Sequence, residues 1–213
     1  MPIADDGLKL ILAGLERFEG RTAYIYNDSA NPPNRTVGVG CLLEDPGAAC
    51  RLPFRNVGEG RPATAAEITA DFLRVKAMPG GLASHLYRVR EGGPVIELDD
   101  DAIATLGIAK LTLDFIPGLR EIFPRFDDFP NPAQCTLIDM AWNLGLGRPP
   151  SPEHRASGLY GFPSLIAACN RGDWEAAAKE SHVATSRDVR NQWRSEQFLA
   201  ARTVISEGNA AVV

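Results

Sequence analysis

The sequence predicts an α+β protein in which a few strands near the N-terminus are followed by a mainly helical remainder. Apolar residues recur at steps of three and four over several long segments, which is typical of amphipathic helices. Near the N-terminus, two short strand-like stretches flank a turn rich in Asn and Pro, which predicts a β-hairpin. The 213 residues, 45% of them hydrophobic and 23% charged, suit one globular domain or two lobes that share a core.

The first helix is predicted over residues 5–18. Its apolar residues form one face: Leu8, Ile11, Leu12, Leu15 and Phe18. Asp5 or Asp6 can cap its start, and Gly20 suits its C-terminal stop. Glu19 is therefore expected in the last turn of this helix.

A hairpin is expected directly after this helix. Residues 23–26 are predicted to form one strand, residues 27–34 a loop, and residues 35–40 the returning strand. Gly38 and Gly40 in the returning strand indicate positions where backbone or ligand approaches closely.

The region after the hairpin is predicted to be less regular. Residues 44–62 are rich in Gly, Pro and Arg and are expected to lack regular structure. The Thr-Ala-Ala-Glu sequence at 64–67 has the form of a capping box, which predicts a helix through Lys76 that residues 79–81 end. A further loop is expected around residues 92–94.

The rest of the chain is predicted to be helical. A long helical pattern follows Asp99, Asp100 and Asp101, which are interpreted as capping and helix-dipole residues rather than as calcium ligands. Pro117 is expected to stop or bend this helix. The remaining helices are predicted over 133–143, 164–170, 174–181 and 188–206, with a loop rich in Gly, Pro and Ser over 146–160.

Charge and hydropathy exclude some classes of function. The net charge of −5 and the pI of about 5.3 argue against broad binding to nucleic acid or to anionic membranes. No apolar run approaches the roughly 20 residues that span a bilayer. The N-terminus lacks the basic and apolar regions of a secretory signal, so we expect synthesis in the cytoplasm and export, if any, by other means. Four C-terminal arginines are expected to form a solvated helix face: Arg187, Arg190, Arg194 and Arg202.

Cysteine and histidine spacing predicts neither a metal nor a cofactor. The four cysteines form no CxxC pair and are expected to be free thiols: Cys41, Cys50, Cys135 and Cys169. A bond between Cys41 and Cys50 would close only a short loop. The three histidines are scattered, without metal-ligand spacing: His85, His154 and His182.

Three polar residues around the predicted hairpin carry the chemistry that we expect. Glu19 ends the first helix, Asp28 lies in the loop between the strands, and Thr36 begins the returning strand. Glycoside hydrolysis needs two carboxyl groups that face one groove, one protonated and one ionised. Exposed carbonyls at a helix C-terminus disfavour a negative charge on Glu19, whereas the polar loop favours an ionised Asp28. The spacing alone is common among unrelated surface carboxylates.

The sequence segments around these residues resemble those of the phage-type lysozymes, a glycoside hydrolase family. The resemblance begins with Phe18-Glu19-Gly20, Ala23-Tyr24-Ile25-Tyr26-Asn27-Asp28 and Thr36-Val37-Gly38-Val39-Gly40. It continues, in the order of the family, with residues 134–145, 161–165, 172–178 and 190–199. It thus covers the larger part of the chain.

This resemblance implies a two-lobed, lysozyme-like fold with a glycan groove between the lobes. The whole chain, 1–213, would be one domain. A β-containing lobe over 19–98 and a helical lobe over 119–213 would be joined by a connecting helix over 99–118 and by the helix over 5–18.

The implied activity is that of a muramidase that hydrolyses the β-1,4 bond between N-acetylmuramic acid and N-acetylglucosamine in peptidoglycan. Glu19 would be the general acid, and Asp28 and Thr36 would place the attacking water. The expected substrate-binding residues are Tyr26, Asn143 and Arg190. The expected partner is the peptidoglycan glycan strand, with a monomer as the active form. This activity would suit a phage endolysin, a bacteriocin or a secreted antibacterial effector. A bacteriocin or an effector would be accompanied by an immunity protein or a delivery system.

The sequence departs from the family pattern at several places. Cys41 stands where the family usually has His, and the turn over 29–35 is longer than usual. Residues 44–98 exceed the compact pattern and are interpreted either as an added wall of the groove or as an insertion far from it. The loop over 147–160 is also enlarged.

Other functions stay open at this point. A lytic transglycosylase on a related fold would need only one catalytic acid. A silent peptidoglycan-binding module would have to do without the acid that Glu19 supplies. A purely structural helical domain would leave the polar hairpin unexplained.

Overall fold

A computed structural model describes residues 3, 5–88 and 95–210, and it has two compact units. The first, here named the β unit, is Leu12–Lys110, and the second, the helical unit, consists of Met1–Ile11 and Leu111–Val213. Helices combined with small antiparallel sheets confirm the predicted α+β class. The lobe boundaries drawn from the sequence stay predictions. The side chains of Asp5 and Asp6, expected as caps, and the loop expected at 92–94 lie outside the described residues.

The end of α1 (Asp5–Glu19) lies in the β unit, which begins within this helix at Leu12. Gly20 follows with φ of 78° and donates its N–H to the carbonyl of Glu16 at 2.9 Å. A left-handed residue here is the usual way to end a helix, and Gly adopts it without steric cost. The expected position of Glu19 at the end of the helix is confirmed.

The hairpin forms, but the sheet has a third strand that the sequence analysis missed. Strands β1 (Thr22–Asn27), β2 (Arg35–Gly38) and β3 (Cys41–Leu43) are antiparallel in the order β1-β2-β3. The returning strand was expected to reach Gly40. Instead the chain turns at Gly38 and Gly40, whose φ angles are 67° and 76°. Strand alternation turns Ile25 and Val37 into the core, where both are fully buried.

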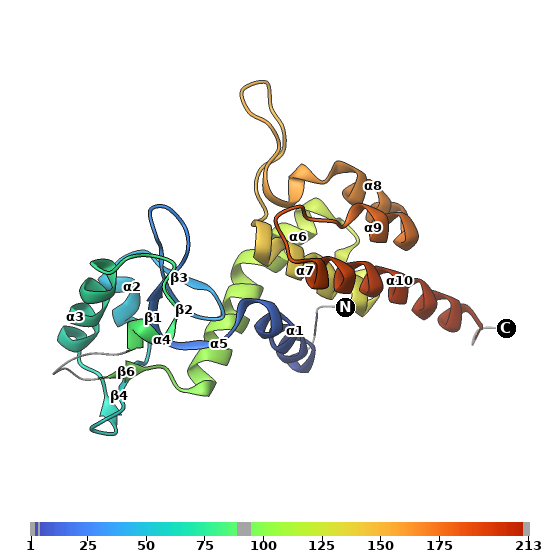
Figure 1. The fold of residues 1–213 in the computed structure, drawn as a ribbon. Helices are drawn as coiled ribbons and strands as arrows, with labels where there is room; N and C mark the ends of the chain where they lie inside the picture. The colour runs from blue at the N-terminus through green and yellow to red at the C-terminus, as the bar shows by residue number, and fades with distance from the viewer. Residues whose placement is uncertain (1–2, 4, 89–94, 211–213) are drawn as a thin grey trace. The chain divides into compact units, whose positions relative to one another are not determined.

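The described residues within 44–98 form several short helices and strands of the β unit (Figure 1). The elements are α2 (Pro46–Cys50), β4 (Arg55–Asn56), β5 (Arg61–Pro62), α3 (Ala65–Lys76), α4 (His85–Arg88) and β6 (Ile96–Glu97). The capping box of Thr64 and Glu67 and the end of α3 at Lys76 are confirmed. Phe54, Phe72 and Tyr87 are almost fully buried. The prediction of irregular structure over 44–62 was wrong: α2 is capped locally by Asp45, which accepts the N–H of Ala48 at 2.7 Å, whereas β4 and β5 have two residues each and depend on strand pairing.

The next helix runs over residues 100–122 as α5 (Asp100–Lys110), a π-helical segment η1 (Leu111–Phe115) and α6 (Ile116–Ile122). Asp99 caps it by accepting the N–H of Ala102 at 2.8 Å, as the capping interpretation predicted. Pro117 does not stop the helix. It lies in the first turn of α6, directly after the π-helical segment, and a first turn tolerates the missing N–H of proline.

Among the described residues, this same helix is long and apolar enough to cross a membrane by length and composition, with a mean hydropathy of 1.4 over its most apolar window. By that measure the expectation that no segment approaches such a length was wrong. Lys110 and Asp114 interrupt the apolar sequence, which hides the pattern from a search for uninterrupted runs. The core helix of a globular protein meets the same criterion.

The helical unit contains η2 (Phe126–Asp128), α7 (Asn131–Leu144), η3 (Gly158–Gly161), α8 (Pro163–Arg171), α9 (Trp174–Glu180) and α10 (Asp188–Ala210). Helix α10 packs against α7 and α9, and α8 packs against α9 (Figure 1). Aromatic rings fill part of the core: Trp174 meets the edge of Phe129 at 5.2 Å and stacks on Phe198 at 6.3 Å between ring centroids. The predicted loop over 146–160 is a narrow hairpin closed by two isolated bridges.

Candidate functional site

Glu19 is held at the start of the β unit by its neighbours in sequence. One carboxylate oxygen of Glu19, Oε1, is buried from solvent. Arg21, two residues on, pairs with Glu16 and donates to the backbone carbonyl of Asp100 at 2.8 Å and to its carboxylate at 3.0 Å. Arg21 therefore ties the end of α1 to the start of α5, and this fixes the backbone that carries Glu19.

Asp28 lies at the tip of β1, and its carboxylate organises the hairpin loop. Oδ1 accepts the N–H groups of Ala30 at 3.0 Å and Asn34 at 2.8 Å, and Oδ2 accepts the side-chain amide of Asn34 at 2.9 Å. Partial burial would raise the pKa of Asp28, but these hydrogen bonds and the positive charge of Arg35 outweigh it, so the pKa lies below its ordinary value. The structure therefore supports the predicted ionised state of Asp28.

Tyr26 and Thr36 face each other across the sheet. They are directly paired in the register of β1 and β2, so strand alternation puts both side chains on one face. Thr36 is 5% exposed, and its hydroxyl lies 3.5 Å from the carbonyl oxygen of Asn34. Burial raises the pKa of Tyr26 to about 12, and the charges of Glu19, Asp28 and Cys41 add to this.

Four of the predicted residues lie in the β unit: Glu19 and Asp28 both act electrostatically on the Tyr26 phenol, and Thr36 is paired with Tyr26 in the sheet. Glu19 comes from α1, Asp28 and Tyr26 from β1 or its end, and Thr36 from β2. Both carboxylates act on the Tyr26 hydroxyl, which keeps its proton over the whole neutral range. An ionised carboxylate and a second acid near one hydrogen-bond donor can support acid–base chemistry.

Cys41, the residue at the place of the family's His, begins β3 opposite Val37 and is buried. All four cysteines are free thiols in the structure, and Cys41 and Cys50 are not bonded to each other. Burial raises the pKa of Cys135 and raises that of Cys169 to about 12, so both thiols stay protonated near neutral pH.

Asn143 and Arg190, the two other predicted binding residues, lie in the helical unit and belong to one hydrogen-bond network, in which Arg190 is buried and Asn143 is exposed. Asp139 of α7 accepts Arg190 Nη2 at 2.7 Å and Arg194 Nε at 2.6 Å. Arg194 Nη2 and the Ser186 hydroxyl in turn donate to Asn143 Oδ1, at 3.1 and 2.8 Å. The structure thus gives Arg190 a structural role, and its role in substrate binding stays a prediction.

The same network corrects the expected solvated arginine face. Arg190 is 7% exposed and Arg194 is fully buried, whereas Arg187 and Arg202 are exposed. The two buried arginines are four residues apart, so they share the face of α10 that packs against α7 and the carboxylate of Asp139. A count of charges along one helix does not reveal this partner, which lies about fifty residues earlier in the chain.

Sequence reasoning also misassigned Asn27, which it counted with the polar loop around Asp28. Asn27 is 1% exposed, and its side-chain amide donates to the carbonyls of Val75 and Met78 at 2.7 and 2.8 Å. Strand alternation is the signal that could have found this, because Asn27 lies on the face opposite Tyr26, with the buried Ile25.

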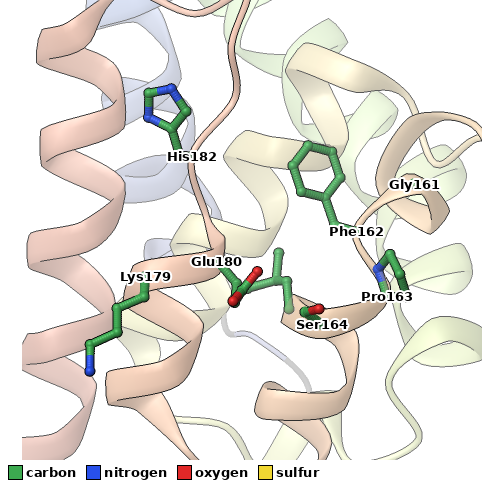
Figure 2. Close-up of a pocket in the computed structure, with 8 residues that line it drawn as sticks. Gly161, Phe162, Pro163, Ser164, Lys179, Glu180 and His182 are labelled. Atoms are coloured by element: carbon green, nitrogen blue, oxygen red, sulfur yellow. The ribbon is translucent and has the colours of Figure 1, made fainter.

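A surface pocket of about 330 Å³ lies in the helical unit, between the start of α8 and the end of α9 (Figure 2). Glu180 and Ser164 point toward its centre, and the Lys179 side chain points away. Its lining comprises Gly161, Phe162, Pro163, Ser164, Leu165, Lys179, Glu180 and His182, most of them exposed. None of the predicted site residues lines it. Over the described part of the chain, no three His, Cys, Asp or Glu side chains are grouped to hold a metal ion.

No model of a protein family matches the chain, and no curated protein sequence matches it. The assignment of the site therefore depends on the residues themselves and on their geometry within the β unit.

Proposed function

We propose that the chain is a muramidase that hydrolyses the β-1,4 bond between N-acetylmuramic acid and N-acetylglucosamine in peptidoglycan. The observation that carries this proposal is that Glu19 and an ionised Asp28, both in the β unit, act electrostatically on the same phenol, that of Tyr26. A glycosidase needs one carboxyl group to protonate the leaving oxygen and a second, ionised one for the water or the developing positive charge. The fold that we propose with it is lysozyme-like.

In this mechanism Glu19 donates its proton to the glycosidic oxygen as the bond to the anomeric carbon breaks. Asp28, kept ionised by Ala30 and Asn34, orients a water molecule that adds to that carbon from the opposite face and gives up a proton to the Asp28 carboxylate. The product is a reducing N-acetylmuramic acid end with inverted configuration. The Thr36 hydroxyl assists in holding the water.

A lytic transglycosylase is the second candidate, and one observation favours it. Both oxygens of Asp28 already accept hydrogen bonds from the loop, and Thr36 is almost fully buried. If neither group reaches a water molecule, Glu19 acts alone and a hydroxyl of the sugar itself displaces the leaving group. The product would then be an anhydro end, lighter by one water.

Digestion of purified cell walls with analysis of the products by mass spectrometry tests these proposals. Glu19→Gln should lower the lytic rate by at least about 10²-fold, the scale of a lost general acid. Asp28→Asn should also abolish hydrolysis while the fold persists. Glu44→Gln, which changes an exposed carboxylate of the same unit, is the matched control and should keep full activity.

The outcomes separate the alternatives clearly. Reducing ends from the wild type, together with loss of activity in both site variants, support the muramidase. Predominantly anhydro ends, with activity retained in Asp28→Asn, would assign the transglycosylase. Near-normal lysis by a folded Glu19→Gln protein would remove Glu19 from the mechanism.

The biological setting follows as part of the proposal. Peptidoglycan lies outside the cytoplasm, so an enzyme of this kind acts in the periplasm or outside the cell after export or lysis. An endolysin, a bacteriocin or a delivered effector, with an immunity protein where self-protection is needed, fits such an activity.

A further inference from the structure

The turn after α3, residues 78–82, is bonded directly to the strand end that carries Asp28. The amide of Asn27 donates to the carbonyls of Val75 and Met78 at the end of α3, at 2.7 and 2.8 Å. The N–H of Gly81 donates to the carbonyl of Asp28 itself at 3.0 Å. Two successive residues of the hairpin are therefore held by one turn, which we call the α3 turn.

Tyr87 of α4 fixes the α3 turn in place. Its side chain is fully buried, and its hydroxyl donates to the carbonyl of Pro79 at 2.7 Å and accepts the N–H of Leu82 at 3.2 Å. The ring of Tyr87 lies 6.5 Å from the ring of Tyr26, between centroids. One buried phenol thus bonds both ends of the α3 turn and contacts the hairpin strand.

The backbones of the α3 turn and the hairpin loop approach each other too closely for a side chain between them. A Cβ atom added at Gly80 would lie 2.7 Å from Pro33 Cβ and 2.9 Å from the Asp28 carbonyl oxygen. Contacts below about 3 Å force one of the two segments to move. Gly80 is therefore required by the close packing of the turn against the loop.

We propose that Asn27, Gly80 and Tyr87 are positioning residues that hold Asp28 in its working geometry through the α3 turn. This inference depends on the proposed function, because it gives Asp28 a part in the reaction. The three hydrogen bonds to the Asp28 carboxylate come from its own loop, so they form only while that loop keeps its shape. A displacement of about 1 Å at a reacting group can cost roughly 10²-fold in rate.

The proposal predicts a change in the ionisation of Asp28 that a purely structural role would not produce. The charged and titratable groups that act on it from neighbouring elements are Arg35 of β2 and Tyr26 of β1, and the α3 turn faces it with the N–H of Gly81. If the loop loosens, the hydrogen bonds that Asn34 and Ala30 donate to the Asp28 carboxylate weaken. The pKa of Asp28 should then rise toward its ordinary value.

The experiment compares Gly80→Ala and Tyr87→Phe with Gly14→Ala as control, since a Cβ at Gly14 meets no atom within 4 Å. The pKa of Asp28 is measured by ¹³C NMR of its side-chain carboxyl, and cell-wall digestion gives kcat and KM. Gly80→Ala should raise that pKa, move the acid limb of kcat to higher pH and lower kcat by about 10- to 100-fold, with KM changed less than about threefold. Gly14→Ala should leave all of these unchanged.

Asn27→Ala is a third variant for use where its fold is retained, as judged by circular dichroism. The proposal is overturned if folded Gly80→Ala and Tyr87→Phe proteins keep the wild-type pKa of Asp28. A raised pKa in these variants supports the positioning role even if the wild type fails to cleave cell walls. Failure of the wild type to cleave cell walls would overturn the proposed function without affecting the positioning role.

Discussion

The buried ion-pair network of the helical unit gives a sharp test of what holds that unit together. Asp139 is 1% exposed and accepts bonds from Arg190 Nε and Nη2 and from Arg194 Nε, at 2.6 to 3.2 Å. Arg194 is fully buried, so its charge depends on groups inside the protein rather than on water. Asp139→Asn keeps the shape of the side chain and removes the charge.

The expected loss is about 3–5 kcal/mol in the free energy of unfolding, the usual cost of taking one partner from a buried ion pair. The removal leaves two guanidinium groups within the unit without this carboxylate, and each hydrogen bond to a charged group contributes roughly 1.5–3 kcal/mol. The exposed pair of Arg120 and Asp127 provides a matched control, because its side chains are 43% and 36% exposed. Asp127→Asn should cost at most about 1 kcal/mol.

Tryptophan fluorescence during urea unfolding measures this difference in the correct part of the chain. The three tryptophans, Trp142, Trp174 and Trp193, all lie in the helical unit. Their emission therefore follows that unit even if the two units unfold separately. Asp139→Asn should lower the urea midpoint strongly with an unchanged slope, whereas Asp127→Asn should leave it nearly in place.

The reasoning fails if the two variants lose similar amounts. A loss below about 1 kcal/mol for Asp139→Asn would mean that water reaches the guanidinium groups or that the network rearranges at little cost. A strongly changed dependence of the free energy of unfolding on urea would mean instead that the variant alters the unfolded state or the two-state behaviour. The loss in the free energy of unfolding would then be measured by thermal unfolding.

Three further outcomes are expected. All four cysteines should react with a thiol reagent after denaturation without reductant, and recovery of fewer would reveal a disulfide. Burial raises the pKa of Cys169 from its ordinary 9.0 to about 12. The stability that the buried, protonated thiol contributes is therefore complete below pH 9 and is lost as the pH rises toward 12. The free energies of unfolding of the wild type and of Cys169→Ala should converge over that range. Gly20→Ala, which forces a side chain into φ of 78°, should cost about 1 kcal/mol, whereas Gly14→Ala in the same helix should stabilise by roughly 0.5–1 kcal/mol, and equal effects would contradict the left-handed stop.

The elements that the sequence predicted are those whose signals are local. The stop of α1 at Gly20, the capping box of Thr64 and Glu67 and the hairpin turn each depend on residues within a few positions of one another. Such signals are readable because a cap or a turn satisfies its own backbone groups.

Several of the elements that were missed depend on distant partners. Strands β4, β5 and β6 have two residues each, and β4 is paired with both others in one sheet, although β6 follows about forty residues later. No period of two can be recognised in two residues. The burial of Arg190 and Arg194 was missed for the same reason, since Asp139 lies on another helix.

The ionised state of Asp28 in the candidate site could be predicted from the sequence. The direction of its remaining acceptor position, on which the proposed chemistry depends, could not. Local composition indicated an ionised Asp28, and the bonds from Asn34 bear this out. An ionised carboxylate has about four acceptor positions, and the loop occupies two on Oδ1 and one on Oδ2. A water molecule held by Asp28 must therefore bind at the remaining position on Oδ2. The direction of that position is set by the loop and, through Gly81 and Asn27, by the α3 turn, which no local pattern in the hairpin sequence encodes. In the proposed mechanism, the choice between hydrolysis and transglycosylation thus depends on a contact some fifty residues away along the chain.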